Sequence, residues 1–417
     1  MKKIILFVLL FLIIKVEAQT STFFTVDSLF AKGRYQLALK ELNNVNKPSF
    51  LSNYKSAIIY ESIDNFPKTI YFLEKALIFK DDYQTKLKLA KAYQRIKKPI
   101  KAIKIYEEIL TKDSLNLVLK YQLGKLYLIA KKGNKAIYTF KNLIIKDSLN
   151  AHYSYQLGIS FALKKDNNRM INSFLDTYRK DSTHLKAIVK LATSFNKLKE
   201  KDSTKIFVNK GLEIDNNHIT LNKLKIKQLY RDKKYAEAIP FLLKLDTITK
   251  NDTYSTSMLG RTYYNLDSLE KADKYFRKLF SLDRENYKSF TYRGHIAIKQ
   301  KKFISANGFY KMATFIGKEK RDEEFYGLGI VSYEMKKPKQ AIINFDRAFS
   351  ENRNNYKALY QSAKITDDYY KDKSIAYKKY LKFIDFFENK DKGLTEFVKK
   401  RISDIKKDYF LRGDKLD

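Results

Sequence analysis

Apolar residues recur along most of this chain at spacings of three and four, which is the pattern of amphipathic helices about three turns long. Residues 117–150 show it clearly. A first apolar stretch contains Leu123 and Tyr127, a polar break follows, and a second stretch contains Phe140 and Leu143. A polar turn with Asp and Ser, residue types that cap helices, then closes the segment. The pattern predicts two short helices joined by a hairpin.

Small residues repeat this layout along the chain with a period of 34 positions. One series stands in the first predicted helix of each segment, with an isoleucine in one place: Ala90, Gly124, Gly158, Ala192, Ile226, Gly260 and Gly294. A second series stands in the second predicted helix: Ala102, Ala136, Ala238, Ala272 and Ala306. A period in this range with helical patterning predicts stacked helix pairs, because no single pair buries enough apolar surface to be stable alone.

The residue types at fixed positions of the period carry a family resemblance. A segment counted from Thr253 has a small residue at position 8, aromatics at 11 and 24, Ala at 20 and an apolar residue at 27: Gly260, Tyr263, Phe276, Ala272 and Leu279. Segments counted from Tyr83 and Leu117 match equally well. This layout resembles the tetratricopeptide repeat, over roughly residues 21–390. Other copies depart from it at position 20, where Ala is replaced: Thr69, Met170 and Thr204.

The resemblance implies an all-α fold, a right-handed superhelical solenoid of about 10–11 stacked antiparallel helix pairs. We expect the repeats to fill residues 19–390, a capping helix at 391–410 to cover the last exposed core, and a polar tail at 411–417. Departures from the pattern at residues 199–205 and at Pro240 are candidate points of altered curvature.

The N-terminus has the pattern of a secretory signal peptide. Lys2 and Lys3 give a positive start, and eleven apolar residues follow at 4–14. Val16 and Ala18 then stand where a signal peptidase reads small or apolar side chains, so we expect cleavage before Gln19. The pattern predicts an exported protein, in a bacterial periplasm or associated with an outer membrane. The alternative is an uncleaved signal that anchors the chain in the inner membrane, although the run is shorter than the roughly 20 residues that a span needs.

The balance of charge is strongly basic, with 83 Lys and Arg against 46 Asp and Glu and a net charge of +37. Such a charge attracts acidic proteins, acidic polymers and anionic membrane surfaces. The alternative is that lysine occupies every solvated helix face and that the charge has no specific partner. The chain has no cysteine, which excludes disulfides and thiolate metal sites.

The resemblance also implies a binding surface, because positions 2, 5, 9 and 12 of each repeat face the concave groove of such solenoids. Tyrosines and cations fill many of these positions, with few acids among them. The candidate partner-binding residues are Tyr121, Lys125, Tyr155, Lys227, Tyr254, Arg261, Tyr264, His295 and Tyr326. This composition favours an acidic protein or peptide, because cations hold carboxylates and tyrosine rings supply flat contact area. The family's carboxylate clamp also needs asparagines in register, and these are missing. The alternative is that most of these tyrosines belong to the core.

Catalytic and cofactor signatures are missing from the sequence. The histidines fall in separate repeats with no metal-binding spacing between them: His152, His184, His218 and His295. There is no phosphate-binding glycine loop and no Gly-x-Ser-x-Gly elbow. We therefore expect no enzyme, no cofactor and no metal site. No nucleic-acid motif is present, and an export signal disfavours DNA or RNA as the physiological partner.

Three hypotheses for function follow. The first is an exported, non-catalytic scaffold that binds an extended peptide segment or a partner helix in the basic, tyrosine-rich groove. The second is a charge-driven binder of anionic envelope polymers or a lipid surface. The third is a structural spacer within a secretion or surface-assembly complex. The sequence favours the first hypothesis and does not identify the partner or the oligomeric state.

Overall fold

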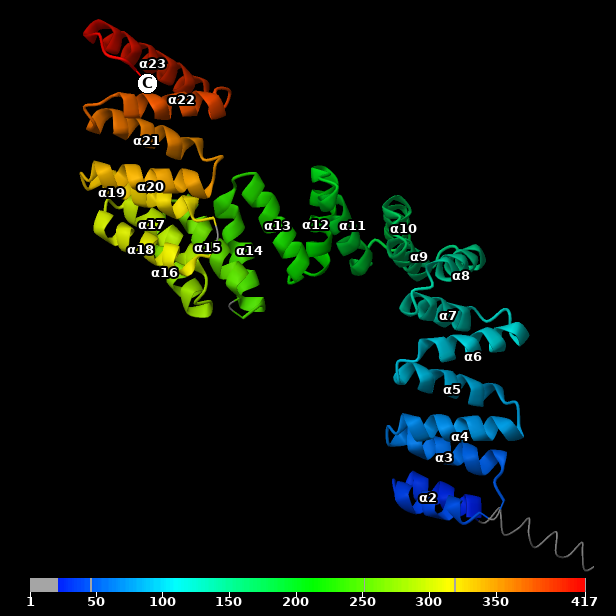
Figure 1. Ribbon diagram of the computed structural model, residues 1–417. Helices are drawn as coiled ribbons and strands as arrows, with labels where there is room; N and C mark the ends of the chain where they lie inside the picture. The colour runs from blue at the N-terminus through cyan, green and yellow to red at the C-terminus, as the bar shows by residue number, and fades with distance from the viewer. Residues whose placement is uncertain (1–21, 46, 251, 319, 417) are drawn as a thin grey trace, which may run out of the picture. The chain divides into compact units, whose positions relative to one another are not determined.

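The computed structural model describes residues 22–45, 47–250, 252–318 and 320–416 (Figure 1). The predicted signal peptide, residues 1–18, lies outside them. The described residues form helices joined by short turns and contain no strand, so the all-α prediction is confirmed. Successive helices are antiparallel and stack as pairs, which is the predicted helix-pair solenoid. We call the first helix of each pair helix A and the second helix B.

The chain divides into two compact units, and each is described by itself. Unit 1 ends at Lys199 and unit 2 begins at Glu200. This division falls within the departure from the repeat pattern at residues 199–205. After a first helix at residues 22–31, unit 1 contains α2 (Tyr35–Asn43), α3 (Phe50–Ser62), α4 (Phe66–Phe79), α5 (Tyr83–Arg95), α6 (Pro99–Lys112), α7 (Leu117–Ile129), α8 (Gly133–Lys146), α9 (Ala151–Leu163), α10 (Asn167–Lys180) and α11 (Leu185–Lys197).

Unit 2 continues the same alternation of helices. It contains α12 (Lys201–Ile214), α13 (Ile219–Arg231), α14 (Tyr235–Ile248), α15 (Thr253–Asn265), α16 (Leu269–Leu282), α17 (Tyr287–Lys299), α18 (Phe303–Ile316), α19 (Asp322–Glu334), α20 (Pro338–Glu351), α21 (Tyr356–Tyr369), α22 (Ser374–Phe387) and α23 (Lys392–Arg412). Within each unit, a helix makes its main contacts with the helix before it, the helix after it or the next helix of its own kind. The core is therefore a continuous strip along each stack.

The small residue at position 8 is where helix B packs most closely on helix A. A Cβ added to Gly260 would lie 2.9 Å from the ring of Phe276, which stands at position 24 of the same repeat. The same pair occurs in four further repeats, with a Cβ 2.6–2.7 Å from the ring: Gly124 and Phe140, Gly158 and Phe174, Gly294 and Tyr310, Gly329 and Phe345. The rings of these pairs are buried. The spacing seen in the sequence thus reports one contact that recurs in register.

The hairpin between helix A and helix B has a left-handed residue at position 15. Glycine takes this place in the first repeat, as Gly33 with a φ of 68°. In seven later repeats the residue is lysine, with φ between 55° and 64°: Lys97, Lys131, Lys165, Lys199, Lys233, Lys301 and Lys336. Asp64 and Asp267 take the same conformation in two more, whereas Tyr370, in the repeat that begins at Tyr356, has a φ of −89°. A side chain with a Cβ is strained there, so most hairpins carry a small conformational cost.

Helix α23 lies against α22 at the C-terminal end of unit 2, with Val398 and Ile405 buried. It runs to Arg412, two residues past the expected end of the capping helix, and Gly413 ends it in the left-handed conformation. Arg401 reaches back to α21 and donates from Nε and a terminal nitrogen to the two oxygens of Asp367, at 2.6 and 2.9 Å. The last helix is therefore fixed by a buried ion pair as well as by apolar contact.

None of the described helices has the length and apolar character needed to cross a lipid bilayer.

Candidate functional site

A row of tyrosines and cations lies on the helix-A side of unit 2, on α13, α15 and α17. Three cation–ring contacts form it: Lys223 Nζ is 4.8 Å from the ring centroid of Tyr254, Arg261 Cζ is 5.9 Å from that of Tyr292, and Lys299 Nζ is 4.5 Å from that of Tyr264. We call these six residues the tyrosine–cation row. Helices α15 and α17 touch directly, so side chains one period apart become neighbours. Each contact of this kind favours an ordered cation over an aromatic face.

Three of the predicted residues belong to this row or lie beside it with exposed side chains. Tyr254 and Arg261 are exposed on α15, and Lys227 is exposed on α13. Tyr264 is half-buried and packs against Tyr292 with ring centroids 5.8 Å apart. Burial raises the pKa of Tyr254 and Tyr264, so both hydroxyls remain protonated donors at neutral pH. The exposed part of the row can therefore offer flat rings, hydroxyl groups and fixed positive charge to a partner.

Both ring nitrogens of His295 have hydrogen-bond partners within the protein. Its Nδ1 is 2.6 Å from the hydroxyl of Tyr310, and its Nε2 is 2.9 Å from Oε1 of Glu323 on α19. Lys288 also donates to Glu323, at 2.6 Å. The hydrogen bond from His295, reinforced by the one from Lys288, lowers the pKa of Glu323 to about 2 against the effect of burial. Glu323 thus already bonds two side chains of α17, whereas Arg261 on α15 faces solvent.

The tyrosines at position 5 are partly core residues. Tyr121, Tyr155 and Tyr326 are half-buried, and each packs against the position-24 ring of its own repeat. The ring centroids are 6.0, 5.6 and 5.3 Å from those of Phe140, Phe174 and Phe345. Each of these rings therefore packs partly in the core, and part of each remains exposed.

The helix-A side of unit 1 contains a second group of predicted residues. Lys125 Nζ lies 5.7 Å from the centroid of Tyr121 on α7. On α9, Tyr155 lies 4.8 Å from His184, and His184 lies 5.5 Å from His152, between ring centroids. Separate repeats therefore bring these two histidines together. Among the described residues, no cluster of three or more His, Cys, Asp or Glu side chains is arranged to hold a metal ion.

Some residues of the row were missed from the sequence. Lys223 stands at position 5, where only tyrosines were considered, and a census of every residue type at that position would have found it. Lys299 and Tyr292 lie at positions 13 and 6, outside the groove positions that the resemblance implies. Lys299 and Tyr292 join the row through side-chain contacts with Tyr264 and Arg261. Such contacts depend on side-chain conformation, so no sequence pattern indicates them.

The comparison with known families falls on this part of the molecule. The sequence profile described as "Tetratricopeptide repeat" matches residues 257–286, which belong to the repeat of α15 and α16. The glycine–aromatic contact of that repeat recurs through both units. Residues 257–286 therefore form a tetratricopeptide repeat, and other helix pairs share its packing. Proteins built from such repeats bind protein or peptide partners and are generally non-catalytic, so the fold is consistent with a protein–protein interaction scaffold.

Several known proteins resemble this chain. The human protein O-mannosyl-transferase TMTC3 is 30% identical over 105 residues, which are 25% of this chain and 11% of that protein. Yeast Tom70 has a similar structure, with a TM-score of 0.42, 13% identity, and coverage of 95% of this chain and 97% of that one. YrrB, described as a TPR protein with an unusual peptide-binding site, has a TM-score of 0.39 and 16% identity, with coverage of 46% of this chain and 97% of that one.

Proposed function

We propose that this protein is an exported, non-catalytic scaffold that binds an extended acidic peptide segment, or a partner helix with an acidic face, on its helix-A side. The tyrosine–cation row is the observation that carries the proposal. Lys223 and Arg261 can hold carboxylates, whereas Lys299 is already paired with Asp267 at 2.8 Å. The rings of Tyr254 and Tyr292 fix the positions of these two cations before a partner arrives. The helices hold this surface preorganised, so binding costs little further side-chain entropy.

The charges of the described residues suggest where in unit 2 the acidic residues of a partner are held. Lys223 is partly exposed on α13, and Arg261 is exposed on α15. On α17, Lys288 and His295 are already hydrogen-bonded to Glu323 of α19. The proposal therefore places the carboxylates of the partner over α13 and α15, and its uncharged residues over α17 and α19.

The decisive experiment compares variants of the full-length mature chain, residues 19–417, as bait in an envelope extract at physiological salt. The groove variant combines Tyr254→Ala with Arg261→Glu. The control combines Tyr138→Ala with Lys141→Glu on α8, a helix B of unit 1, where both side chains are exposed and the loss of ring and charge is the same. We expect one or two proteins to be retained by the unchanged chain and the control, and lost by the groove variant. Equal retention by all three baits would contradict the proposed site.

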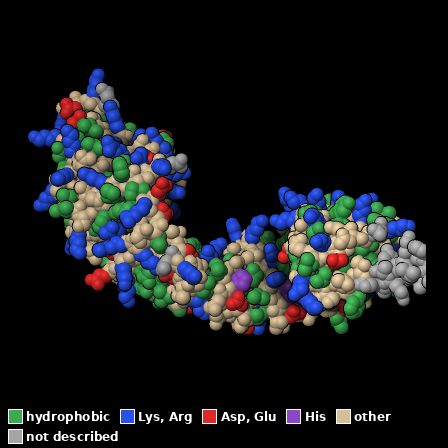
Figure 2. All heavy atoms as spheres, turned by 90° about the horizontal axis from the view of Figure 1, so that it is seen from below, with side chains coloured by type: hydrophobic (Ala, Val, Ile, Leu, Met, Phe, Trp, Pro, Cys, Tyr) green, Lys and Arg blue, Asp and Glu red, His purple; other side chains and the backbone are tan. Residues whose placement is uncertain are grey.

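Charge alone is the competing explanation. Figure 2 shows Lys and Arg side chains over much of the visible surface of both units, with fewer Asp and Glu. If the charge is the activity, the retained species will be diverse and anionic, will fall away as salt rises, and will be lost equally from the groove and control variants. A stable complex that neither variant disturbs would instead support a structural spacer.

Export is proposed from the pattern at residues 1–18. Expression in a Gram-negative host followed by fractionation and N-terminal sequencing tests it. A periplasmic chain that begins at Gln19 is the expected result. A cytoplasmic chain that begins at Met1 would contradict export, and a membrane-bound chain that retains residues 1–18 would support the anchor.

A further inference from the structure

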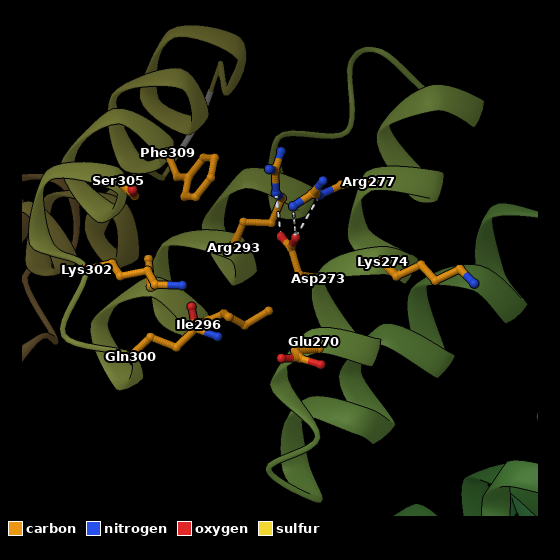
Figure 3. Close-up of a pocket in the computed structure, with 11 residues that line it drawn as sticks. Glu270, Asp273, Lys274, Arg277, Arg293, Ile296, Gln300, Lys302, Ser305 and Phe309 are labelled. Carbon is orange, nitrogen blue, oxygen red and sulfur yellow. Dashed lines mark hydrogen bonds and ion pairs between the residues drawn. The ribbon is translucent and has the colours of Figure 1, made fainter.

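A cleft of about 480 Å³ opens in unit 2, and none of its lining residues belongs to the tyrosine–cation row. Residues of α16, α17 and α18 line it (Figure 3). In Figure 3 the carboxylate of Asp273 lies between the side chains of Arg277 and Arg293. The guanidinium carbon of Arg293 lies 4.2 Å from the ring centroid of Phe309 on α18. This stack holds one arginine at a fixed place in the cleft wall.

The charges in this cleft are not balanced. Asp273 accepts hydrogen bonds from Nε of Arg277 at 2.7 Å and from Nε of Arg293 at 2.8 Å. Among the described residues, Asp273 is the carboxylate with which both arginines form ion pairs. Two guanidinium groups, each with five N–H donors, share one carboxylate, so donors and positive charge remain for a second anion. The full lining has four Lys and Arg side chains against Glu270 and Asp273.

A second cleft, of about 440 Å³, lies on the other side of α18 and is lined by α18, α19 and α20. Three cations line it, Lys311, Lys337 and Arg347, and none of the described residues in its lining is acidic. The guanidinium carbon of Arg347 is 5.8 Å from the ring centroid of Phe325. The two clefts therefore share a design, in which an arginine lies over a phenylalanine and the cations outnumber the acids.

Unit 1 shows that this design is not a property of every helix-B cleft. A cleft of about 500 Å³ lined by α6, α7 and α8 includes Leu110, Leu123 and Tyr138. It also has two lysines, and one of them, Lys135, is ion-paired with Glu107 at 2.8 Å. Its lining contains no arginine and no phenylalanine, so the stacked arginine distinguishes the two clefts beside α18.

We propose that the two clefts that flank α18 together form a second docking surface for an acidic segment of a partner protein. Their charge matches Asp and Glu side chains, and fixed guanidinium groups suit carboxylates in particular. Phe309 and Phe325 offer apolar contact, and side-chain amides such as Gln300 and Gln340 can bind a peptide backbone. A peptide with mixed acidic and apolar side chains fits these features better than a uniform polyanion. Neither cleft is lined by a residue of the tyrosine–cation row. This proposal therefore does not depend on the function proposed for that row.

The test uses the full-length mature chain and a fluorescein-labelled peptide of alternating Glu and Leu. Roughly ten residues suffice, because an extended chain of that length reaches about 30 Å and crosses three neighbouring helices. The cleft variant combines Arg277→Glu with Lys311→Glu. The control combines Lys104→Glu with Lys141→Glu, which changes the net charge equally at exposed positions on helices B of unit 1. Fluorescence anisotropy at physiological salt measures binding, and circular dichroism checks that both variants are folded.

We expect the cleft variant to bind the peptide at least about tenfold more weakly, because two reversed charges face it, and the control to bind within about twofold. Equal losses in the two variants would overturn the proposal in favour of the general field. Loss on Arg261→Glu instead of the cleft variant would move the peptide to the helix-A side and also overturn it. A sulfated polysaccharide that displaces the peptide and binds the cleft variant equally well would show that charge alone is recognised, with the same consequence.

A second readout requires no substitution. The same peptide with a photoreactive benzoylphenylalanine in place of one Leu is crosslinked to the unchanged chain and mapped by mass spectrometry. Crosslinks confined to α16, α18 and α20 would support the docking surface. Crosslinks on α13 and α15, or scattered through both units, would overturn it.

Discussion

Gly260 and Phe276 are in closer contact than a residue with a Cβ would allow at this site. A Cβ on Gly260 would lie 2.9 Å from two carbons of the Phe276 ring. The ring is fully buried between the helices of its repeat, so it has little room to move. This contact sets the distance between α15 and α16.

We predict that Gly260→Val lowers the free energy of unfolding by about 2 kcal/mol, because the new side chain overpacks a site that is already full. Chemical denaturation of the full chain measures the change. The matched control is Gly308→Ala, in the middle of α18, where an added Cβ would meet nothing within 4 Å. This control should raise stability by about 0.5–1 kcal/mol, as alanine does in an exposed helix interior. Equal destabilisation by both changes would show that the ring contact is not the cause.

The left-handed lysines at the hairpins give a second prediction. Replacing Lys131 and Lys301 by glycine should stabilise the chain by about 0.5–1 kcal/mol each, because glycine adopts a positive φ without strain. The two sites lie in different units, so their effects should add. Lys131→Gln is the control, since it removes the charge and keeps the strain. If glutamine stabilises as much as glycine, relief of charge repulsion is the explanation and the conformational argument fails.

The position of Glu323 between His295 and Lys288 gives a prediction in pH. Its pKa is lowered from the ordinary 4.5 to about 2, so the stabilisation it gives is complete above 4.5 and is lost as pH falls toward 2. The melting temperature of the wild type should exceed that of Glu323→Gln at pH 7, and the difference should shrink through this range. Glu334→Gln, at an exposed position near the end of the same helix, should show no such trend. A difference independent of pH would mean that the pairing does not depend on ionised Glu323.

The ion pair between Arg401 and Asp367 predicts how the C-terminal end opens. Neighbouring cations, chiefly through the hydrogen bonds from Arg401, hold the pKa of Asp367 below its usual value despite burial. Arg401→Met should leave a buried carboxylate poorly paired and weaken the docking of α23 by about 2–3 kcal/mol. Hydrogen exchange should then speed up in α23 more than elsewhere. Arg412→Met breaks an exposed pair with Asp408 and should change little, about 0.5 kcal/mol or less. If the two changes had equal effects, the ion pair between Arg401 and Asp367 would not be what holds α23 in place.

The regular part of the fold could be predicted from sequence, because each repeat solves the same packing problem with the same residue types. The glycine at position 8 and the ring at position 24 are visible as spacing, and the structure shows the contact that makes the spacing necessary. The ends of the pairs also follow from local signals, such as Asn116 and Asp252 capping α7 and α15.

The binding surfaces were less accessible to sequence reasoning. The position of a residue in the repeat indicates which side of a helix it occupies. It does not indicate whether another side chain already pairs with that residue. His295 and Arg261 stand at equivalent positions, yet one is bonded to Glu323 and the other is exposed. The clefts beside α18 arise from residues of three helices, and no repeat position singles them out. Such features depend mostly on pairs of side chains from neighbouring helices, and a single sequence does not reveal which pairs form.

The contacts between helices have a consequence for the time at which the chain can fold. Because each helix makes its main contacts with near neighbours in sequence, no part of the core waits for a distant segment. A repeat can close as soon as the following pair is available to cover it, on a ribosome or at the exit of a translocation channel. Folding can then advance from one end as the chain is delivered, and α23 arrives last to cover the final open face.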